Sequence, residues 1–586
     1  MKKIIAVLCF AFLIFNSSDA QNFTHADTLR GSNGPGRSWW NATKYNLHVK
    51  FNFQDSTISG YNIISYQPIL KDHPGFFQID LQKPMEMDSA ILETGSPEYP
   101  LNKTNLAFTR EGNAFFVFLK NQPSPMVAKH DINTIMITQK NSKEDKPNDR
   151  KIKEVSNLVV YYHGKPRIAK KAPWDGGFVW NRDKAGNPWV AVVCQGWGAS
   201  VWYPCKDYQG DEPDSAEMHF TAPSDLITVS NGRLRSVENA GDGNSVYTWA
   251  VVSPINNYDI TFYIGKFVHF GQIYKGEKGN LTMDYWVLDS NLAKAKVHFK
   301  DAPRMMKAFE YWFGPYPFYK DGYKLVDAPY LGMEHQSAIA YGNHYMEGYL
   351  GHDLSHSGWG MKWDFIIVHE SAHEWFGNNI TSKDLADMWI HESFANYAES
   401  LFTEYYYGKK AGDEYVIGTR KNILNDKPII AHYGVNEEGS GDMYYKGGNM
   451  IHMIRQIINN DEKFRSILRG LNKTFYHQTV TSKQIEDYIN QRSGIDFSKV
   501  FEQYLTTIQI PELEYKKIDG IIYYRWVNCI DGFNMALKIY NAKGNLIFIH
   551  PTQKFKPVPK GVKEIKVDEN FYVGTKDLNQ ENQIQK

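Results

Sequence analysis

Residues 362–397 read KWDFIIVHESAHEWFGNNITSKDLADMWIHESFANY. The apolar run in the first half predicts a helix over Lys362–Phe376, and Gly377-Asn378-Asn379 is typical of the C-cap that ends one. A second helix is predicted over Asp384–Tyr407, because Gly408 gives it a clear end. The stretch therefore predicts two consecutive helices joined by a short connection.

The first of these helices carries the pattern H-E-x-x-H, formed by His369, Glu370 and His373. Residues four apart lie on one face of an α-helix, so both imidazoles can bind a single ion. Glu392, on the second helix, has apolar neighbours, and a carboxylate in such a setting needs a partner. Two histidines and one carboxylate leave the fourth position of a tetrahedral zinc site to water, as in catalytic sites. We therefore predict that His369, His373 and Glu392 bind one Zn²⁺ ion, with Glu370 as the general base of an amide hydrolysis.

The rest of the chain divides into regions of different periodicity. Between about residues 40 and 268 apolar and polar residues alternate, as in Tyr45–Phe53, which predicts an antiparallel β domain. Helical periodicity dominates from about 290 to 507, and alternation returns beyond 512. We predict a multidomain α+β protein with an N-terminal β domain (21–268), a mainly helical catalytic domain (269–511) and a small C-terminal β-sandwich-like domain (512–586).

The first twenty residues have the features of an export signal. Lys2 and Lys3 precede the apolar run Ile4–Phe15, and Ser18-Asp19-Ala20 offers small residues before a cleavage site at Gln21. Twelve apolar residues are too few to cross a bilayer. We therefore predict a signal peptide over residues 1–20, an exported protein (periplasmic, surface-associated or secreted), and no transmembrane anchor in the mature chain.

Composition narrows the classes of function. Apolar residues make up 42% and charged residues 22%, which is ordinary for a globular protein. The formal net charge is zero, so no overall field attracts nucleic acid, and none is expected as a partner. A bridge between Cys194 and Cys205 is conceivable, but we expect buried free thiols, because the mature chain keeps an odd number of cysteines, with Cys529.

The sequence resembles the gluzincin aminopeptidases related to aminopeptidase N and leukotriene hydrolase. The resemblance covers most of the mature chain and includes the zinc pattern described above. Residues Tyr330–His335 (YLGMEH) are similar to the family motif G-x-M-E-N, with departures at Leu331 and His335. Residues 444–447 (YYKG) resemble the family's Y-E-K-G, and Gln195 has the spacing of the family's substrate-binding glutamine. The resemblance implies a thermolysin-like fold for the catalytic domain.

The same resemblance implies a zinc aminopeptidase that acts on peptides with a free N-terminus. Glu334 would bind the α-ammonium group, helped by Gln195, because a carboxylate one residue's reach from zinc distinguishes a free amine from an internal amide. Tyr444 would donate a hydrogen bond to the developing oxyanion, and the register favours it over Tyr445. Further substrate-binding roles are implied for Tyr330, Gly332 and Met333.

Other polar residues near these motifs are expected to be structural, namely His335, His391 and Lys446. Glu399 follows Glu392 by two turns and could orient a ligand histidine. We nevertheless expect it to have no such role, as is usual for a helix glutamate. Long family members also carry a helical domain after the β-sandwich, and this sequence has no counterpart of it, which predicts a more open cleft.

Three alternative functions remain. A zinc-dependent epoxide hydrolase would use the same ligands, although an export signal is less compatible with a lipid substrate. A thermolysin-like endopeptidase would leave Glu334 and Gln195 unexplained. A noncatalytic peptide-binding protein on the same scaffold would have no need of the complete ligand set together with Glu370 and Tyr444.

Overall fold

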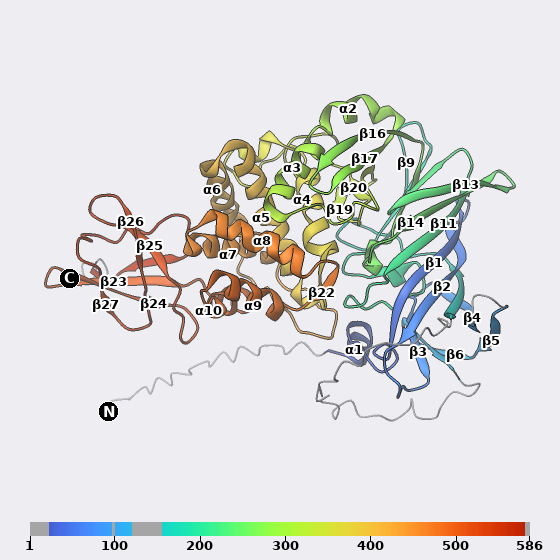
Figure 1. Cartoon of the computed structure of the whole chain (residues 1–586), viewed down its shortest axis with the longest axis horizontal. Coiled ribbons are helices and arrows are strands. Elements are labelled where there is room, and N and C mark those ends of the chain that lie inside the picture. Colours follow the sequence, from blue (N-terminus) through green and yellow to red (C-terminus); the bar gives the residue numbers. More distant parts are fainter. Residues whose placement is uncertain (1–22, 96–99, 120–154, 580–586) are drawn as a thin grey trace, which may run out of the picture.

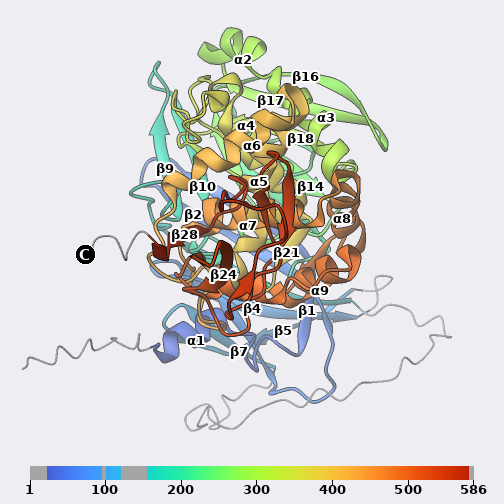
Figure 2. The same ribbon diagram turned by 90° about the vertical axis from the view of Figure 1, so that its left-hand side faces the viewer.

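The computed structural model describes residues 23–95, 100–119 and 155–579. A β-rich N-terminal region, a helical region and a C-terminal β region follow one another along the long axis (Figure 1). Figure 2 views this row from its C-terminal end, with the C-terminal strands in front of the helices. The predicted multidomain α+β fold class is confirmed, whereas the predicted domain boundaries stay predictions. The predicted signal peptide lies outside the described residues.

The N-terminal region is built almost entirely of strands, preceded by helix α1 (His25–Gly31). The strands are β1 (Trp40–Asn52), β2 (Thr57–Pro68), β3 (Phe76–Asp80), β4 (Glu86–Gly95), β5 (Asn102–Leu106), β6 (Phe108–Glu111), β7 (Ala114–Phe118), β8 (Val155–Gly164), β9 (Gly177–Arg182), β10 (Pro188–Val193), β11 (Ser215–Pro223), β12 (Ile227–Ser230), β13 (Arg233–Gly241), β14 (Asn244–Val251) and β15 (Phe262–Gly265). The largest sheet has the order β13-β14-β11-β1-β2-β8-β4-β5. Its pairs are antiparallel except β1 with β11, so the predicted antiparallel domain contains one parallel pair.

Strand β1 shows why this region folds as a sheet. Tyr45, Leu47, Val49 and Phe51 are all buried, while the residues between them are at least partly exposed. This is the period of two that a strand with one covered face requires. The strand predicted at Tyr45–Phe53 is therefore confirmed, although it begins earlier than expected.

The helical region contains a sheet and the helices packed against it. Its strands are β16 (Phe267–Gly276), β17 (Gly279–Leu288), β18 (Tyr323–Asp327), β19 (Gly332–Met333), β20 (Ile339–Tyr341), β21 (Ile380–Ser382) and β22 (Gln478–Val480). Its helices are α2 (Leu292–His298), α3 (Asp301–Phe313), α4 (Phe365–Ala372), α5 (Trp389–Tyr407), α6 (Lys409–Gly418), α7 (Asp442–Ile458), α8 (Asp461–Thr474), α9 (Ser482–Ser493) and α10 (Ser498–Thr506). The main sheet has the order β16-β17-β18-β20-β19, which leaves β19 at its edge.

Helices α4 and α5 correspond to the two helices predicted from residues 362–397, but both are shorter. Helix α4 starts late because Asp364 accepts the N-cap hydrogen bond from the backbone of Ile367 at 3.1 Å. It ends before Gly377, whose φ of 140° cannot continue a helix. Asp384 caps a separate short turn at Leu385–Asp387 instead of α5 itself. The helix ends were therefore predicted wrongly by a few residues.

The C-terminal region packs directly on the helices. Its strands are β23 (Glu512–Ile518), β24 (Ile521–Val527), β25 (Leu537–Tyr540), β26 (Leu546–Ile549), β27 (Lys556–Pro557) and β28 (Gly574–Asp577). Buried residues such as Trp526 and Phe571 belong to the same hydrophobic core as the helical region. The Tyr504 hydroxyl of α10 donates to the backbone carbonyl of Tyr572 at 2.7 Å. The helical and C-terminal regions therefore share one core.

Two further predictions can be compared with the described residues. Among them, no helix combines the length and the apolar character needed to cross a membrane. Cys194 and Cys205 are buried and make no disulfide bond, and Cys529 is also a free thiol. The expectation of buried free thiols for Cys194 and Cys205 is therefore confirmed.

Candidate active site

The three predicted metal ligands meet between α4 and α5. His369 lies in the last turn of α4, His373 directly follows that helix, and Glu392 lies in the first turn of α5. The Nε2 atoms of His369 and His373 are 3.6 and 3.4 Å from Oε2 of Glu392. All three residues are buried, and their ligand atoms lie within 4.8 Å of one another. One ion can bridge atoms at this spacing.

The hydrogen bonds of the two histidines show which ring atoms face the metal. Nδ1 of His369 donates to Oε1 of Glu399 at 2.8 Å, and Nδ1 of His373 donates to the carbonyl of Phe376 at 3.1 Å. In the neutral rings these bonds keep the proton on Nδ1 and leave the Nε2 lone pairs directed at Glu392. Oε2 of Glu392 makes no hydrogen bond. Three electron-pair donors that face one another fit a divalent cation, and this donor set suits zinc.

The electrostatics of the cluster also require a positive charge beside Glu392. Burial tends to raise the pKa of Glu392, but the neighbouring imidazoles outweigh burial and lower that pKa below its usual value. Burial tends to lower the pKa of His373, whereas the carboxylate of Glu392 outweighs it and raises the pKa to about 9. Both shifts express one attraction between a buried anion and a nearby cation. A zinc ion supplies the same compensation.

Glu399 forms a hydrogen bond with His369, one of the predicted metal ligands. It is buried, and besides His369 it accepts a hydrogen bond from the hydroxyl of Tyr415 on α6 at 2.7 Å. Asn396 also donates to it, at 3.2 Å. The expectation that Glu399 has no contact with a ligand histidine is therefore wrong. The sequence could not show this, because the burial of Glu399 depends on how α6 packs against α5.

Replacing Glu399 by alanine should weaken zinc binding about 10- to 100-fold, because His369 would lose the partner that fixes its ring. Competition with a chromogenic zinc chelator measures this affinity. Glu399→Gln is the matched control, since it keeps an acceptor oxygen and should retain most of the affinity. Equal zinc affinities for the alanine variant and the parent protein would contradict this role.

Glu370, the predicted general base, lies on α4 against the edge strand β19. A Cβ atom added at Gly332 would lie 2.5 Å from Oε1 of Glu370, so a larger residue there would push the Glu370 carboxyl out of this position. Ligand atoms of Glu370, Glu334 and His373 lie within 4.8 Å of one another. Burial raises the pKa of Glu370 to about 7, against the opposite effect of the two histidines. The carboxyl group is therefore close to both the metal ligands and Glu334.

Glu334 directly follows β19 and lies beside the metal ligands. Nε2 of Gln195, in the turn after β10, donates to Oε1 of Glu334 at 2.7 Å and to Oε1 of Glu392 at 3.4 Å. The hydroxyl of Tyr258 donates to the same oxygen of Glu334 at 3.3 Å. Tyr258 belongs to no motif and was not predicted from the sequence. The structure thus brings Glu334 and Gln195 together, and their roles toward a substrate stay predictions.

Tyr444 lies on α7 and covers the metal site. Its ring stacks on that of His369, with centroids 5.9 Å apart and planes inclined by 30°. Burial, followed by the carboxylate of Glu392, raises the pKa of Tyr444 well above its usual value, so its hydroxyl stays protonated and can donate. For Tyr445, burial and the carboxylate of Glu399, rather than that of Glu392, raise the pKa. The structure therefore places Tyr444, rather than Tyr445, at the metal ligands.

Tyr330, Met333 and His335 of the Tyr330–His335 motif are buried around β19. The hydroxyl of Tyr330 donates to the carbonyl of Val192 at 3.0 Å, and Met333 is 2% exposed in the N-terminal core. Nδ1 of His335 shares a hydrogen bond with the hydroxyl of Tyr263 at 2.7 Å. Burial lowers the pKa of His335 to about 3, so its ring is neutral at physiological pH. Contact of Tyr330 and Met333 with a substrate stays a prediction.

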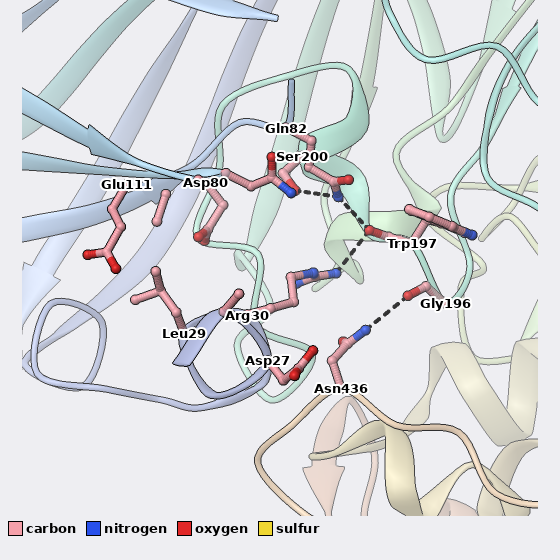
Figure 3. Close-up of a pocket in the computed structure, with 14 residues that line it drawn as sticks. Asp27, Leu29, Arg30, Asp80, Gln82, Glu111, Gly196, Trp197, Ser200 and Asn436 are labelled. Carbon is pink, nitrogen blue, oxygen red and sulfur yellow. Dashed lines mark hydrogen bonds between the residues drawn. The ribbon is translucent and has the colours of Figure 1, made fainter. Parts of the chain in front are cut away.

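The turn that carries Gln195 is held from two sides (Figure 3). Arg30 of α1 donates to the carbonyl of Trp197 at 3.1 Å, and Asn436, from the loop before α7, donates to the carbonyl of Gly196 at 3.1 Å. A cavity of about 480 Å³ lies beside this turn. Bonds from the N-terminal helix and from the helical region therefore fix the position of Gln195.

Fold and site together have the arrangement of an H-E-x-x-H zinc site in which the third ligand comes from the following helix. Residues 298–504 match the peptidase family M1 domain. The matched residues include the three predicted metal ligands and Glu370, and the resemblance to the gluzincin aminopeptidases is confirmed.

Curated aminopeptidases are similar to more than half of this chain. Probable aminopeptidase 2 of Sulfurisphaera tokodaii is 23% identical over 386 residues, which are 63% of this chain and 45% of that protein. Aminopeptidase M1 of Arabidopsis thaliana is 24% identical over 345 residues, 54% of this chain and 37% of that protein. The chain thus spans less than half the length of these curated relatives.

Among solved structures, an M1 zinc metallopeptidase from Deinococcus radiodurans has a similar fold, with a TM-score of 0.63 at 18% identity. The similarity covers 82% of this chain and 96% of that one. A mutant of the Deinococcus enzyme bound to a Tyr-Ser-Ala substrate has a TM-score of 0.62, also at 18% identity, and covers 81% of this chain and 95% of its own.

Proposed function

We propose that this protein is a zinc aminopeptidase that hydrolyses the first peptide bond of peptides with a free N-terminus. The observation that carries the proposal is the position of Glu334, whose carboxylate lies beside the metal ligands and the predicted base. A buried carboxylate at that distance binds the α-ammonium group of a peptide whose first carbonyl reaches the metal. The aminopeptidase relatives and the peptide-bound Deinococcus enzyme support this function.

Each residue of the site has a part in the proposed reaction. Glu370 accepts the proton of the attacking water and passes it to the departing amine. The hydroxyl of Tyr444 donates to the oxygen that becomes negative as water adds to the carbonyl. When bound by the two histidines and Glu392, zinc supplies a Lewis acid that polarises the carbonyl and acidifies water. Glu334 and Gln195 hold the amine, which fixes the first peptide bond over these groups.

The position of Glu334 also favours an aminopeptidase over an endopeptidase. An endopeptidase must let the chain continue on the amine side of the cleaved bond. In the proposed binding mode Glu334 occupies that side, and both Gln195 and Tyr258 donate to its carboxylate. We also propose that the protein is exported, on the strength of the features of residues 1–20, and that its zero net charge leaves no role for nucleic acid.

Replacing Glu334 by alanine should lower kcat/KM for aminoacyl p-nitroanilides about 10- to 100-fold, because a charge-assisted hydrogen bond to the substrate amine is lost. The parent protein should cleave leucyl p-nitroanilide and leave the N-acetylated compound intact. Glu334→Gln tests the charge alone, because it keeps the shape of the side chain. Equal cleavage of the free and acetylated substrates by the parent would contradict the proposed exopeptidase function.

A further inference from the structure

A loop of the helical region carries an acidic residue, Glu438, toward the candidate active site. The loop precedes α7, and Asn436 anchors it by donating to the carbonyl of Gly196, next to Gln195. The backbone N–H of Ser440 donates to the carbonyl of Pro428 at 2.9 Å. Glu438 is therefore held between the turn that carries Gln195 and the start of α7, which carries Tyr444.

Glu438 differs from its neighbour Glu437 in having no partner. Glu437 pairs with Nδ1 of His432 at 2.6 Å. Among the described residues, no side chain forms a hydrogen bond or an ion pair with the carboxylate of Glu438, and the residue is exposed. Lys427 binds only its backbone carbonyl, at 3.1 Å. The carboxylate of Glu438 is therefore free to meet a ligand.

The electrostatic neighbours of Glu438 are the carboxylates of the active site. Surrounding protein atoms raise the pKa of Glu438 to about 7, and Glu392 and Glu334 add to this effect, while Lys427 opposes it. Glu438 in turn is one of the groups that raise the pKa of Tyr444. The geometry of the loop agrees with these effects: Asn436 binds the carbonyl of Gly196, and the adjacent Gln195 donates to both Glu334 and Glu392. Glu438, two residues after Asn436, therefore lies on the side of the site where these carboxylates are.

Three acidic residues of the proposed site have an assigned partner or reaction step, and Glu438 has none. In the proposed function Glu392 binds the metal, Glu334 binds the α-ammonium group of the substrate, and Glu370 exchanges a proton with water. Glu438 has neither a cation nor a proton-transfer step, and unlike the buried carboxylates of Glu334, Glu370 and Glu392 it is exposed. An exposed carboxylate without a partner, close to a site that holds other carboxylates, favours a ligand that brings one more positive charge.

We propose that Glu438 makes the enzyme prefer peptides whose first residue has a cationic side chain, lysine or arginine; this rests on the aminopeptidase function proposed above. The first residue is favoured over the second because its side chain and its α-ammonium group leave the same Cα atom. A substrate amine on Glu334 therefore places a long basic side chain in the neighbourhood of Glu438.

The test compares arginyl, citrullyl and leucyl p-nitroanilides, whose leaving group has no side chain of its own. Citrulline has nearly the shape of arginine but no charge. The parent protein should favour the arginyl over the citrullyl substrate in kcat/KM by about tenfold or more, as expected for a charge-assisted contact. Glu438→Gln should lower this ratio about tenfold and leave citrullyl and leucyl cleavage nearly unchanged.

Two further variants sharpen the result. Glu437→Gln makes the same charge change one position away and should keep the parental ratio, whereas Glu438→Lys should disfavour the arginyl substrate. An arginyl-to-citrullyl ratio that is the same in the parent and in Glu438→Gln overturns the proposal for Glu438, even if all three substrates are cleaved. Failure of the parent to cleave any of the three would instead count against the aminopeptidase function.

Discussion

Replacing Glu370 by glutamine should lower kcat about a hundredfold to ten-thousandfold, because glutamine cannot accept the proton of the attacking water. The amide keeps the size of the side chain, so it should fit against Gly332 without disturbing β19. Zinc binding should persist, since Glu370 is not one of the three proposed ligands. Steady-state kinetics with leucyl p-nitroanilide, alongside metal analysis of the same sample, measures both quantities.

The Glu370→Gln result separates catalysis from folding. A variant with bound zinc and an unchanged melting temperature but little turnover identifies Glu370 as a group that acts on the reacting atoms. A kcat within a few-fold of the parent value would show that another residue is the base. The nearest acidic alternative is Glu334, which shares the same small space and whose alanine variant is already part of the tests above.

Replacing His373 by alanine should remove the metal and, with it, the activity. The remaining ligands are His369 and Glu392, and two protein donors bind zinc far more weakly than three. Glu392 would also lose the imidazole that compensates its buried charge. Metal analysis after gel filtration should therefore find no stoichiometric zinc, and aminoacyl substrates should be cleaved at the background rate.

A stability measurement provides the control for the His373→Ala variant. A ligand that binds only the folded state stabilises it by about 4 kcal/mol when present at a thousand times its Kd. A chelator should therefore lower the melting temperature of the parent protein and leave that of His373→Ala unchanged. Retention of one zinc per chain by the variant would contradict the proposed ligand set.

Much of the metal site could be predicted from the sequence because its geometry is mostly local. The four-residue spacing of His369 and His373 fixes their common face on a helix, and Glu392 was identified by its apolar setting on the next helix. The helix ends could not be predicted with the same accuracy, since they depend on single side chains. Asp364 caps α4 two residues after its predicted start, and Asp384 caps a separate short turn before α5.

The residues that support the ligands were harder to predict. Glu399 and Tyr258 belong to no motif, and their contacts arise from the packing of α6 on α5 and of the N-terminal region on β19. The local sequence around a buried helix glutamate that binds a histidine does not differ from that around a glutamate exposed to solvent. Glu438 likewise gives no sequence signal, because only the path of the loop before α7 brings it close to the turn that carries Gln195.

The residues next to the proposed amine-binding Glu334 and the helices that carry the predicted metal ligands pack in different hydrophobic cores. Met333 and Tyr330, which flank Glu334 in sequence, pack in the core of the N-terminal region, whereas the helices that carry the metal ligands pack in the other core. The proposed binding of the amine by Glu334 and Gln195 therefore depends on how the two cores are aligned, whereas the proposed activation of water depends on one core. A small displacement of one core against the other would therefore alter the proposed selection of substrates more than the proposed hydrolytic step.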